Sequence, residues 1–149
     1  LPCLNTLSKN LKLACHIFSE HDIQPVFEMI NGTDMPRFLV QNIAQAQEML
    51  EAVQHPTLKM QYDCYHMAMM GEDVLQGLQE NIQDIGHIQF ADCPGRHEPD
   101  TAQIMYANIF EWLQHSSYDG FIAAEYRPKT VSTQSFAWKA KYFAAHPLS

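Results

Sequence analysis

Short apolar runs alternate with segments of helical periodicity along most of this 149-residue chain. The runs that predict strands span residues 24–28, 58–63, 85–90 and 120–125. Helices are expected where apolar side chains recur near a period of 3.6, at residues 7–19, 35–53, 73–82, 106–115 and 135–143. This alternation favours an α/β fold in which helices cover a parallel sheet, as a single domain over residues 1–149.

The longest predicted helix spans residues 35–53. Its apolar side chains fall on one helical face, at Phe38, Ile43, Ala46, Met49, Leu50 and Val53. Pro36 suits the first turn of such a helix, and the dipeptide His55–Pro56 ends it.

Composition and charge narrow the class of protein. Hydrophobic residues make up 46% of the chain and charged residues 17%, which is typical of a globular domain. No run approaches the roughly 20 apolar residues of a membrane span, and no secretory signal pattern is visible. The net charge of −8 argues against a nucleic-acid partner. The four cysteines form no C-x-x-C pair and are expected to be reduced thiols, so we expect a cytoplasmic protein that handles small molecules or metal cations.

Polar residues stand at or near the carboxyl end of every predicted strand. They are Glu28, Asp63, Gln89 and Glu125, each one βα unit from the next. The carboxyl ends of parallel strands share one rim, where ligands bind in such folds. Carboxylates gathered there repel one another unless a cation lies between them. Because all four donors are hard oxygen atoms, the pattern predicts Mg²⁺ or Mn²⁺.

Four segments of the chain resemble the hydroxypyruvate isomerase family of xylose-isomerase-like TIM barrels. They are FEMIN (27–31), LKMQYDCYHM (58–67), GHIQFADCPGRHEP (86–99) and YDGFIAAEYRP (118–128), and the third is the most specific. The likeness runs from about residue 25 to residue 143. It implies a (β/α)₈ barrel of about 250 residues, of which this chain is similar to the second half only, with about four βα units.

The resemblance also implies roles for individual residues. Glu28, Asp63, Gln89 and Glu125 match the metal ligands of the family, and the two glutamates also match the pair that moves the proton. His66, expected on the loop after the second strand, matches a residue that contacts a substrate oxygen. Arg96 matches a loop residue that helps to bind the substrate. For His97 and Glu98 the sequence allows two roles, as members of the site or as residues that brace that loop, and we favour the second.

The implied reaction interconverts hydroxypyruvate and tartronate semialdehyde. A proton leaves a carbon next to a carbonyl and returns to the neighbouring carbon through an enediolate, which a divalent metal would stabilise. A carboxylate whose pKa is raised toward the working pH suits the proton transfer. The substrate is an anion, so a cation should bind its carboxylate, and Arg96, Arg127 and Lys129 are the candidates.

Alternative functions stay open at this stage. One is an isomerase or epimerase of another small sugar acid, such as 2-oxo-tetronate, and another is a non-catalytic truncated barrel that serves as a binding module. Abasic-site nucleases on a related barrel need a His-rich multi-zinc site and a basic face, and neither is evident in the sequence. Four strands also leave two open sheet edges. We therefore expect a fragment of a longer enzyme, pairing with another protomer, or an aggregation-prone half-barrel.

Overall fold

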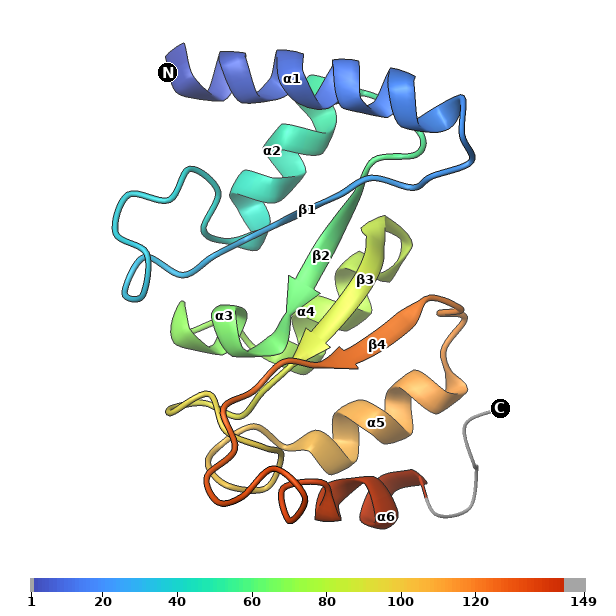
Figure 1. Ribbon diagram of the computed structural model, residues 1–149. Helices are drawn as coiled ribbons and strands as arrows, with labels where there is room; N and C mark the ends of the chain where they lie inside the picture. Colours follow the sequence, from blue (N-terminus) through green and yellow to red (C-terminus); the bar gives the residue numbers. More distant parts are fainter. Residues whose placement is uncertain (1, 144–149) are drawn as a thin grey trace.

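Four parallel strands form one sheet in the order β1-β2-β3-β4 in the computed structural model, which describes residues 2–143 (Figure 1). The strands are β1 (Val26–Glu28), β2 (Lys59–Asp63), β3 (Ile85–Phe90) and β4 (Phe121–Ala124). Neighbours in the sheet are also neighbours in the chain, and a helix-containing crossover joins each pair. The predicted α/β fold with a parallel sheet is confirmed.

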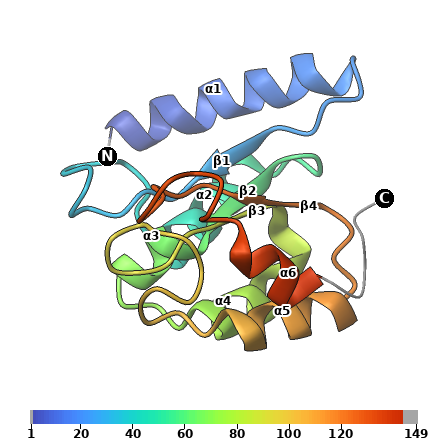
Figure 2. The same ribbon diagram turned by 60° about the horizontal axis from the view of Figure 1, so that its bottom comes forward.

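Helices alternate with the strands along the chain. They are α1 (Pro2–Ser19), α2 (Ile43–Val53), α3 (Cys64–Met69), α4 (Val74–Asn81), the short 3₁₀ helix η1 (Ile82–Asp84), α5 (Tyr106–His115) and α6 (Ala137–Phe143). Figure 2 shows α4, α5 and α6 together on one side of the sheet. Helix α1 packs against α2, where Cys15 is buried with Met49 and Val53. No helix within residues 2–143 has both the length and the apolar character needed to cross a membrane.

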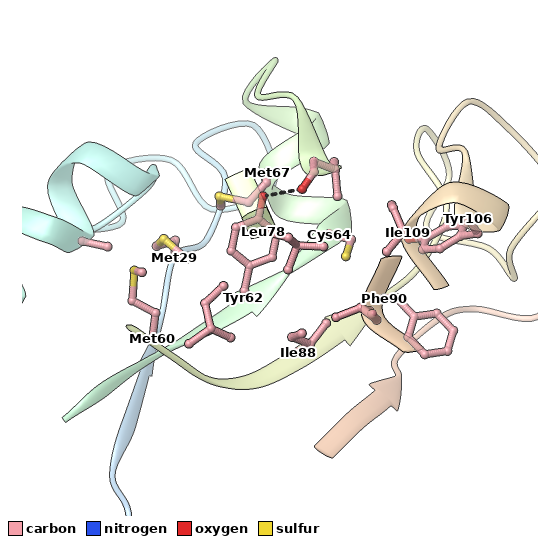
Figure 3. Packing of buried hydrophobic residues seen from close by; sticks show 14 of the residues in the cluster. Met29, Met60, Tyr62, Cys64, Met67, Leu78, Ile88, Phe90, Tyr106 and Ile109 are labelled. Atoms are coloured by element: carbon pink, nitrogen blue, oxygen red, sulfur yellow. Dashed lines mark hydrogen bonds between the residues drawn. The ribbon is translucent and has the colours of Figure 1, made fainter. Parts of the chain in front are cut away.

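The core lies between the sheet and these helices (Figure 3). Successive side chains of a strand point to opposite faces, so Met60 and Tyr62 of β2 and Ile88 and Phe90 of β3 all face the helices, where they are buried. The Tyr62 hydroxyl donates a hydrogen bond to the Val74 carbonyl oxygen at 3.2 Å. The intervening side chains of these strands therefore lie on the opposite face of the sheet.

The predicted helix over residues 35–53 is wrong in its first part, because α2 begins only at Ile43. Residues 32–37 form turns and bends instead. The Asn42 side chain caps α2 by accepting a hydrogen bond from the Gln45 backbone N–H at 2.9 Å. Short polar side chains of this kind satisfy the free N–H groups at the start of a helix. The helix therefore begins after the capping residue, even though the apolar periodicity extends further toward the N-terminus.

Helix α3 was not predicted, and its first residue directly follows β2. The Asp63 carboxylate caps it by accepting from the Tyr65 backbone N–H at 2.9 Å. His66 therefore lies on a helix and not on the expected loop. Among the other elements, α1 begins at Pro2, before the expected residue 7, while β3 and α5 have the predicted bounds.

Strands β1 and β4 form the two edges of the sheet. Phe121 at the start of β4 is 84% exposed and Ile122 is 37% exposed, so this edge is both apolar and open. Backbone groups and apolar side chains at an open edge favour pairing with a further strand. The expectation that other chain segments complete the sheet stays a prediction.

Candidate metal-binding active site

Glu28, Asp63 and Glu125 meet at the carboxyl ends of the strands. Glu28 ends β1 and Asp63 ends β2, while Glu125 follows β4 and donates its backbone N–H to the Phe90 carbonyl oxygen at 3.1 Å. Glu28, Asp63 and His66 each offer one possible metal-ligating atom, and these three atoms lie within 4.8 Å of one another. The structure thus brings together side chains that are far apart in the sequence.

Asp63 is the most buried of the three carboxylates and has no exposed surface. Its Oδ1 atom caps α3, whereas its Oδ2 atom lies 3.2 Å from Arg96 Nη2 and 3.7 Å from His66 Nε2. Burial raises the pKa of Asp63 to about 7, although the Arg96 charge acts in the opposite direction. A second cation close to this buried carboxylate would stabilise its ionised form.

Glu28 is partly buried and lies beside the same group of charges. Its Oε1 atom is 3.8 Å from His66 Nε2. Burial, and then the negative charge of Glu125, raise the pKa of Glu28, while a hydrogen bond from Gln61 and the charge of Arg96 lower it. A carboxylate with a raised pKa is a better proton acceptor in neutral solution than an ordinary surface glutamate.

The Arg96 guanidinium lies between two of the carboxylates. Its Nη2 atom is 3.2 Å from Asp63 Oδ2 and 2.6 Å from Glu125 Oε2, and its central carbon lies 5.1 Å from the centre of the Tyr65 ring. The Arg96 backbone has φ 55° and its carbonyl oxygen accepts from the Arg127 N–H at 2.7 Å. Arg96 thus supplies the positive charge that the carboxylates require.

The loop that carries Arg96 is organised by Asp92, a fully buried carboxylate that the sequence reasoning missed. Its two oxygen atoms accept from four backbone N–H groups at 2.8–2.9 Å, those of Cys93, Thr101, Ala102 and Ile104. An aspartate two residues after a strand, and just before a Pro- and Gly-containing segment, is the signal that was available.

His97 and Glu98 brace the same loop, which confirms their interpretation. His97 Nδ1 lies 2.7 Å from the Arg127 carbonyl oxygen, and Glu98 Oε2 accepts from the Lys129 backbone N–H at 2.9 Å. Arg127 lines the cavity at the site, together with Arg96.

Gln89 is level with Asp63 in the sheet register, on the same face. Its Oε1 atom accepts a hydrogen bond from Gln61 Nε2 at 2.6 Å. The amide oxygen that was predicted as a ligand is therefore engaged by a neighbouring strand, and its role toward a metal stays a prediction.

His66 is buried and contacts Asn31, a residue to which the sequence reasoning gave no role. His66 Nδ1 lies 2.6 Å from Asn31 Nδ2 and 3.4 Å from the Asn31 backbone nitrogen. Burial, and then the charge of Arg96, lower the pKa of His66 to about 4. The imidazole is therefore neutral in neutral solution.

A cavity of about 590 Å³ opens above these side chains. Its lining includes Glu28, Tyr65, His66, Arg96, Glu125 and Arg127. Negative and positive side chains thus face one space, which suits a small molecule with oxygen atoms and a negative charge.

Residues 2–142 match the family described as xylose isomerase-like TIM barrel, and the chain belongs to this family. It is 35% identical to a 2-oxo-tetronate isomerase of Cupriavidus necator over 94% of this chain and 54% of that protein. It is also 35% identical to the hydroxypyruvate isomerase of Escherichia coli, over 92% of this chain and 53% of the relative. The chain therefore spans about half the length of the curated relatives it matches.

Solved structures show the same architecture. A protein from Brucella melitensis described as an AP endonuclease of family 2 superposes with a TM-score of 0.89 at 28% identity, over 94% of this chain and 54% of its own. A 3-keto-D-glucoside 4-epimerase of E. coli superposes with a TM-score of 0.81 over 93% of this chain and 53% of its own, and at 21% identity it shows the fold alone.

Proposed function

We propose that this chain carries the metal-binding and proton-transfer residues of an isomerase that interconverts hydroxypyruvate and tartronate semialdehyde. The observation that carries the proposal is the meeting of Glu28, Asp63 and Glu125 at one rim, beside a cavity that Arg96 and Arg127 also line. The E. coli relative named hydroxypyruvate isomerase supports the choice of substrate.

The donor set fits a divalent cation. Asp63 Oδ2 is buried, and the Arg96 guanidinium forms ion pairs with both Asp63 and Glu125. These carboxylates thus require a positive charge between them, which a divalent cation would also supply. Carboxylate oxygens at the carboxyl ends of three strands, with the amide oxygen of Gln89 once its hydrogen bond from Gln61 is broken, would hold Mg²⁺ or Mn²⁺. Such a cation stabilises negative charge that develops on the substrate oxygens.

The positions of the two glutamates support the proposal that they transfer the proton. Glu28 and Glu125 belong to opposite edges of the sheet, so they approach a bound substrate from different sides. In the proposed reaction, one of them removes the proton from the carbon next to the carbonyl, and the proton returns to the neighbouring carbon. The hydroxyl proton of the first carbon passes to the former carbonyl oxygen with the help of the other glutamate, so that a new carbonyl and a new hydroxyl form. The raised pKa of Glu28 suits this exchange. The guanidinium groups of Arg96 and Arg127 would bind the substrate carboxylate.

A second candidate substrate is 2-oxo-tetronate, a longer acid of the same class. The C. necator relative named 2-oxo-tetronate isomerase, which is as similar as the E. coli protein, favours it. The two substrates share the reacting atoms and differ in the part that extends into the cavity. Parallel assays with both acids distinguish them.

The direct experiment follows exchange of the substrate proton with deuterated water by NMR, with Mn²⁺ or Mg²⁺ added. We expect exchange with the native chain, loss of exchange in Glu125→Gln, and no change in Glu111→Gln, an exposed glutamate on α5 that serves as the matched control. Mn²⁺ binding without any exchange would replace the isomerase proposal with the non-catalytic alternative. Absence of Mn²⁺ binding would remove the metal site itself.

A further inference from the structure

We infer that Asn31 holds His66 in the tautomer that carries its proton on Nε2, so that His66 faces the carboxylates as a hydrogen-bond donor and not as a metal ligand. Asn31 is then a positioning residue. The use of this donor in catalysis rests on the proposed function, whereas the tautomer itself rests only on hydrogen bonds within the chain.

Two backbone hydrogen bonds fix the orientation of the Asn31 amide. Its Oδ1 atom accepts from the backbone N–H groups of Thr33 at 3.0 Å and Asp34 at 2.8 Å. Only the amide oxygen can accept these two hydrogen bonds, so the NH₂ group must lie on the other side. It lies there 3.0 Å from Asp34 Oδ2 and 2.6 Å from His66 Nδ1.

Two hydrogen-bond donors next to Nδ1 determine which nitrogen of the imidazole carries the proton. His66 Nδ1 is approached by two donors of one residue, the Asn31 amide NH₂ at 2.6 Å and the Asn31 backbone N–H at 3.4 Å. A nitrogen that accepts from donors carries no hydrogen of its own. A neutral imidazole has one N–H group, which must then be at Nε2.

The Nε2 atom of His66 faces two carboxylates. It lies 3.7 Å from Asp63 Oδ2 and 3.8 Å from Glu28 Oε1. Both distances exceed a direct hydrogen bond, so an oxygen atom of a substrate or a water molecule is the natural acceptor of this N–H group. A metal ion would need the lone pair of Nε2, which this tautomer does not offer. The proximity of His66 to two carboxylates therefore does not make it a third ligand.

The bonds around Asn31 show why the arrangement is stable. Asn31 has no exposed surface. The Tyr65 hydroxyl donates a hydrogen bond to Asp34 Oδ2 at 2.8 Å, which holds in place the carboxylate that accepts from the Asn31 amide. His66 is also buried. The orientation of the imidazole is thus set before any ligand binds.

The spectroscopic test measures the imidazole ¹⁵N signals of His66, assigned by their loss in His66→Gln. We expect a protonated Nε2 and an unprotonated Nδ1 in the native chain. In the double variant Asn31→Asp/Asp34→Asn the carboxylate and the amide exchange places, so an acceptor faces Nδ1 and the proton is expected to move there. Asp34→Asn alone keeps Asn31 and is the matched control. A proton on Nδ1 in the native chain, or an unchanged pattern in the double variant, would overturn the inference.

A second readout uses Mn²⁺ and Zn²⁺ titrations by calorimetry. His66→Gln is expected to change both affinities by less than about threefold, whereas the double variant, which frees the Nε2 lone pair, should bind Zn²⁺ about tenfold more tightly. A loss of tenfold or more in Mn²⁺ affinity on His66→Gln would make His66 a ligand and contradict the inference. If no variant binds either metal, the proposed metal site fails, while the ¹⁵N pattern still decides the tautomer.

Discussion

The two faces of the sheet differ sharply in chemistry. The face toward the helices carries Met60, Tyr62 and Ile88, which are fully or almost fully buried among other apolar side chains (Figure 3). The opposite face of the same strands carries Gln61 and Gln89, joined by a hydrogen bond, and leads to the carboxylates. Burial of each large apolar side chain stabilises the fold by about 1.5–3 kcal/mol. The face toward the helices thus stabilises the fold. The opposite face can therefore hold polar groups that contribute little to stability.

The largest expected effect is a loss of stability that differs between the two faces of strand β3. Phe90 of β3 packs against Tyr106, Phe110 and Trp138, so Phe90→Ala should lower the free energy of unfolding by about 3–5 kcal/mol. His87→Ala, on the opposite face of β3, is the matched control and should cost less than about 1 kcal/mol. Urea denaturation followed by circular dichroism measures both. Equal losses would show that the two faces contribute alike to stability.

The next effect concerns the loop at the rim. Asp92→Ala removes the acceptor of four backbone N–H groups and should destabilise the protein by about 1.5–3 kcal/mol. Because the same loop carries Arg96, hydrogen exchange of its amides should increase while that of β2 and β3 is retained. Native protection of the loop amides in this variant would contradict the role of Asp92.

A smaller effect is expected at Arg96, where the guanidinium and a metal ion compete for the same carboxylates. Arg96→Gln should tighten Mn²⁺ binding about tenfold, which corresponds to about 1.4 kcal/mol. Arg127→Gln is the control, because Arg127 lines the same cavity but, within residues 2–143, forms no ion pair with these carboxylates. It should change the affinity by less than about twofold. Weaker Mn²⁺ binding in Arg96→Gln would mean that Arg96 assists the metal site.

The smallest effect is the dependence on pH. Burial raises the pKa of Asp63 from its ordinary value to about 7, so the metal-free protein is most stable with respect to this group at acidic pH and loses stability as pH rises toward 7. Metal binding needs the ionised form, so Mn²⁺ affinity should increase about fourfold between about pH 6.5 and about pH 8. Calorimetric titration across this range tests the sign for Mn²⁺ affinity, and urea denaturation of the metal-free protein at acidic and at neutral pH tests the sign for stability. Asp63→Asn is the variant that lacks the titrating group in both measurements. An affinity that falls with pH would contradict the assignment of Asp63.

The sequence predicted the parts of the fold that depend on periodicity. Strand β3 and helix α5 have the expected bounds, and the carboxylates at the strand ends meet as expected because parallel strands share one rim. The turns after β1 and the short helix α3 were missed, since they are set by hydrogen bonds of Asn31, Asn42 and Asp63 with nearby backbone groups. Such bonds leave little trace in an apolar pattern.

The contacts within the site were harder to predict than its location. The pairing of Arg96 with Asp63 and Glu125 joins segments that are distant in the chain. The same holds for the contact of Asn31 with His66. Which polar side chains meet across a rim depends on loop conformation and rotamers, which single residues do not reveal.

Asp63 uses its two oxygen atoms for different purposes. Oδ1 is tied to the Tyr65 N–H at the start of α3, so the carboxyl group is held in one rotamer while Oδ2 faces the site. The entropic cost of orienting this side chain therefore belongs to folding and does not weaken the binding of a ligand. An incoming cation meets an oxygen atom that already points at it, and a lengthened side chain such as that of Asp63→Glu would forfeit this preorganisation even with its charge unchanged.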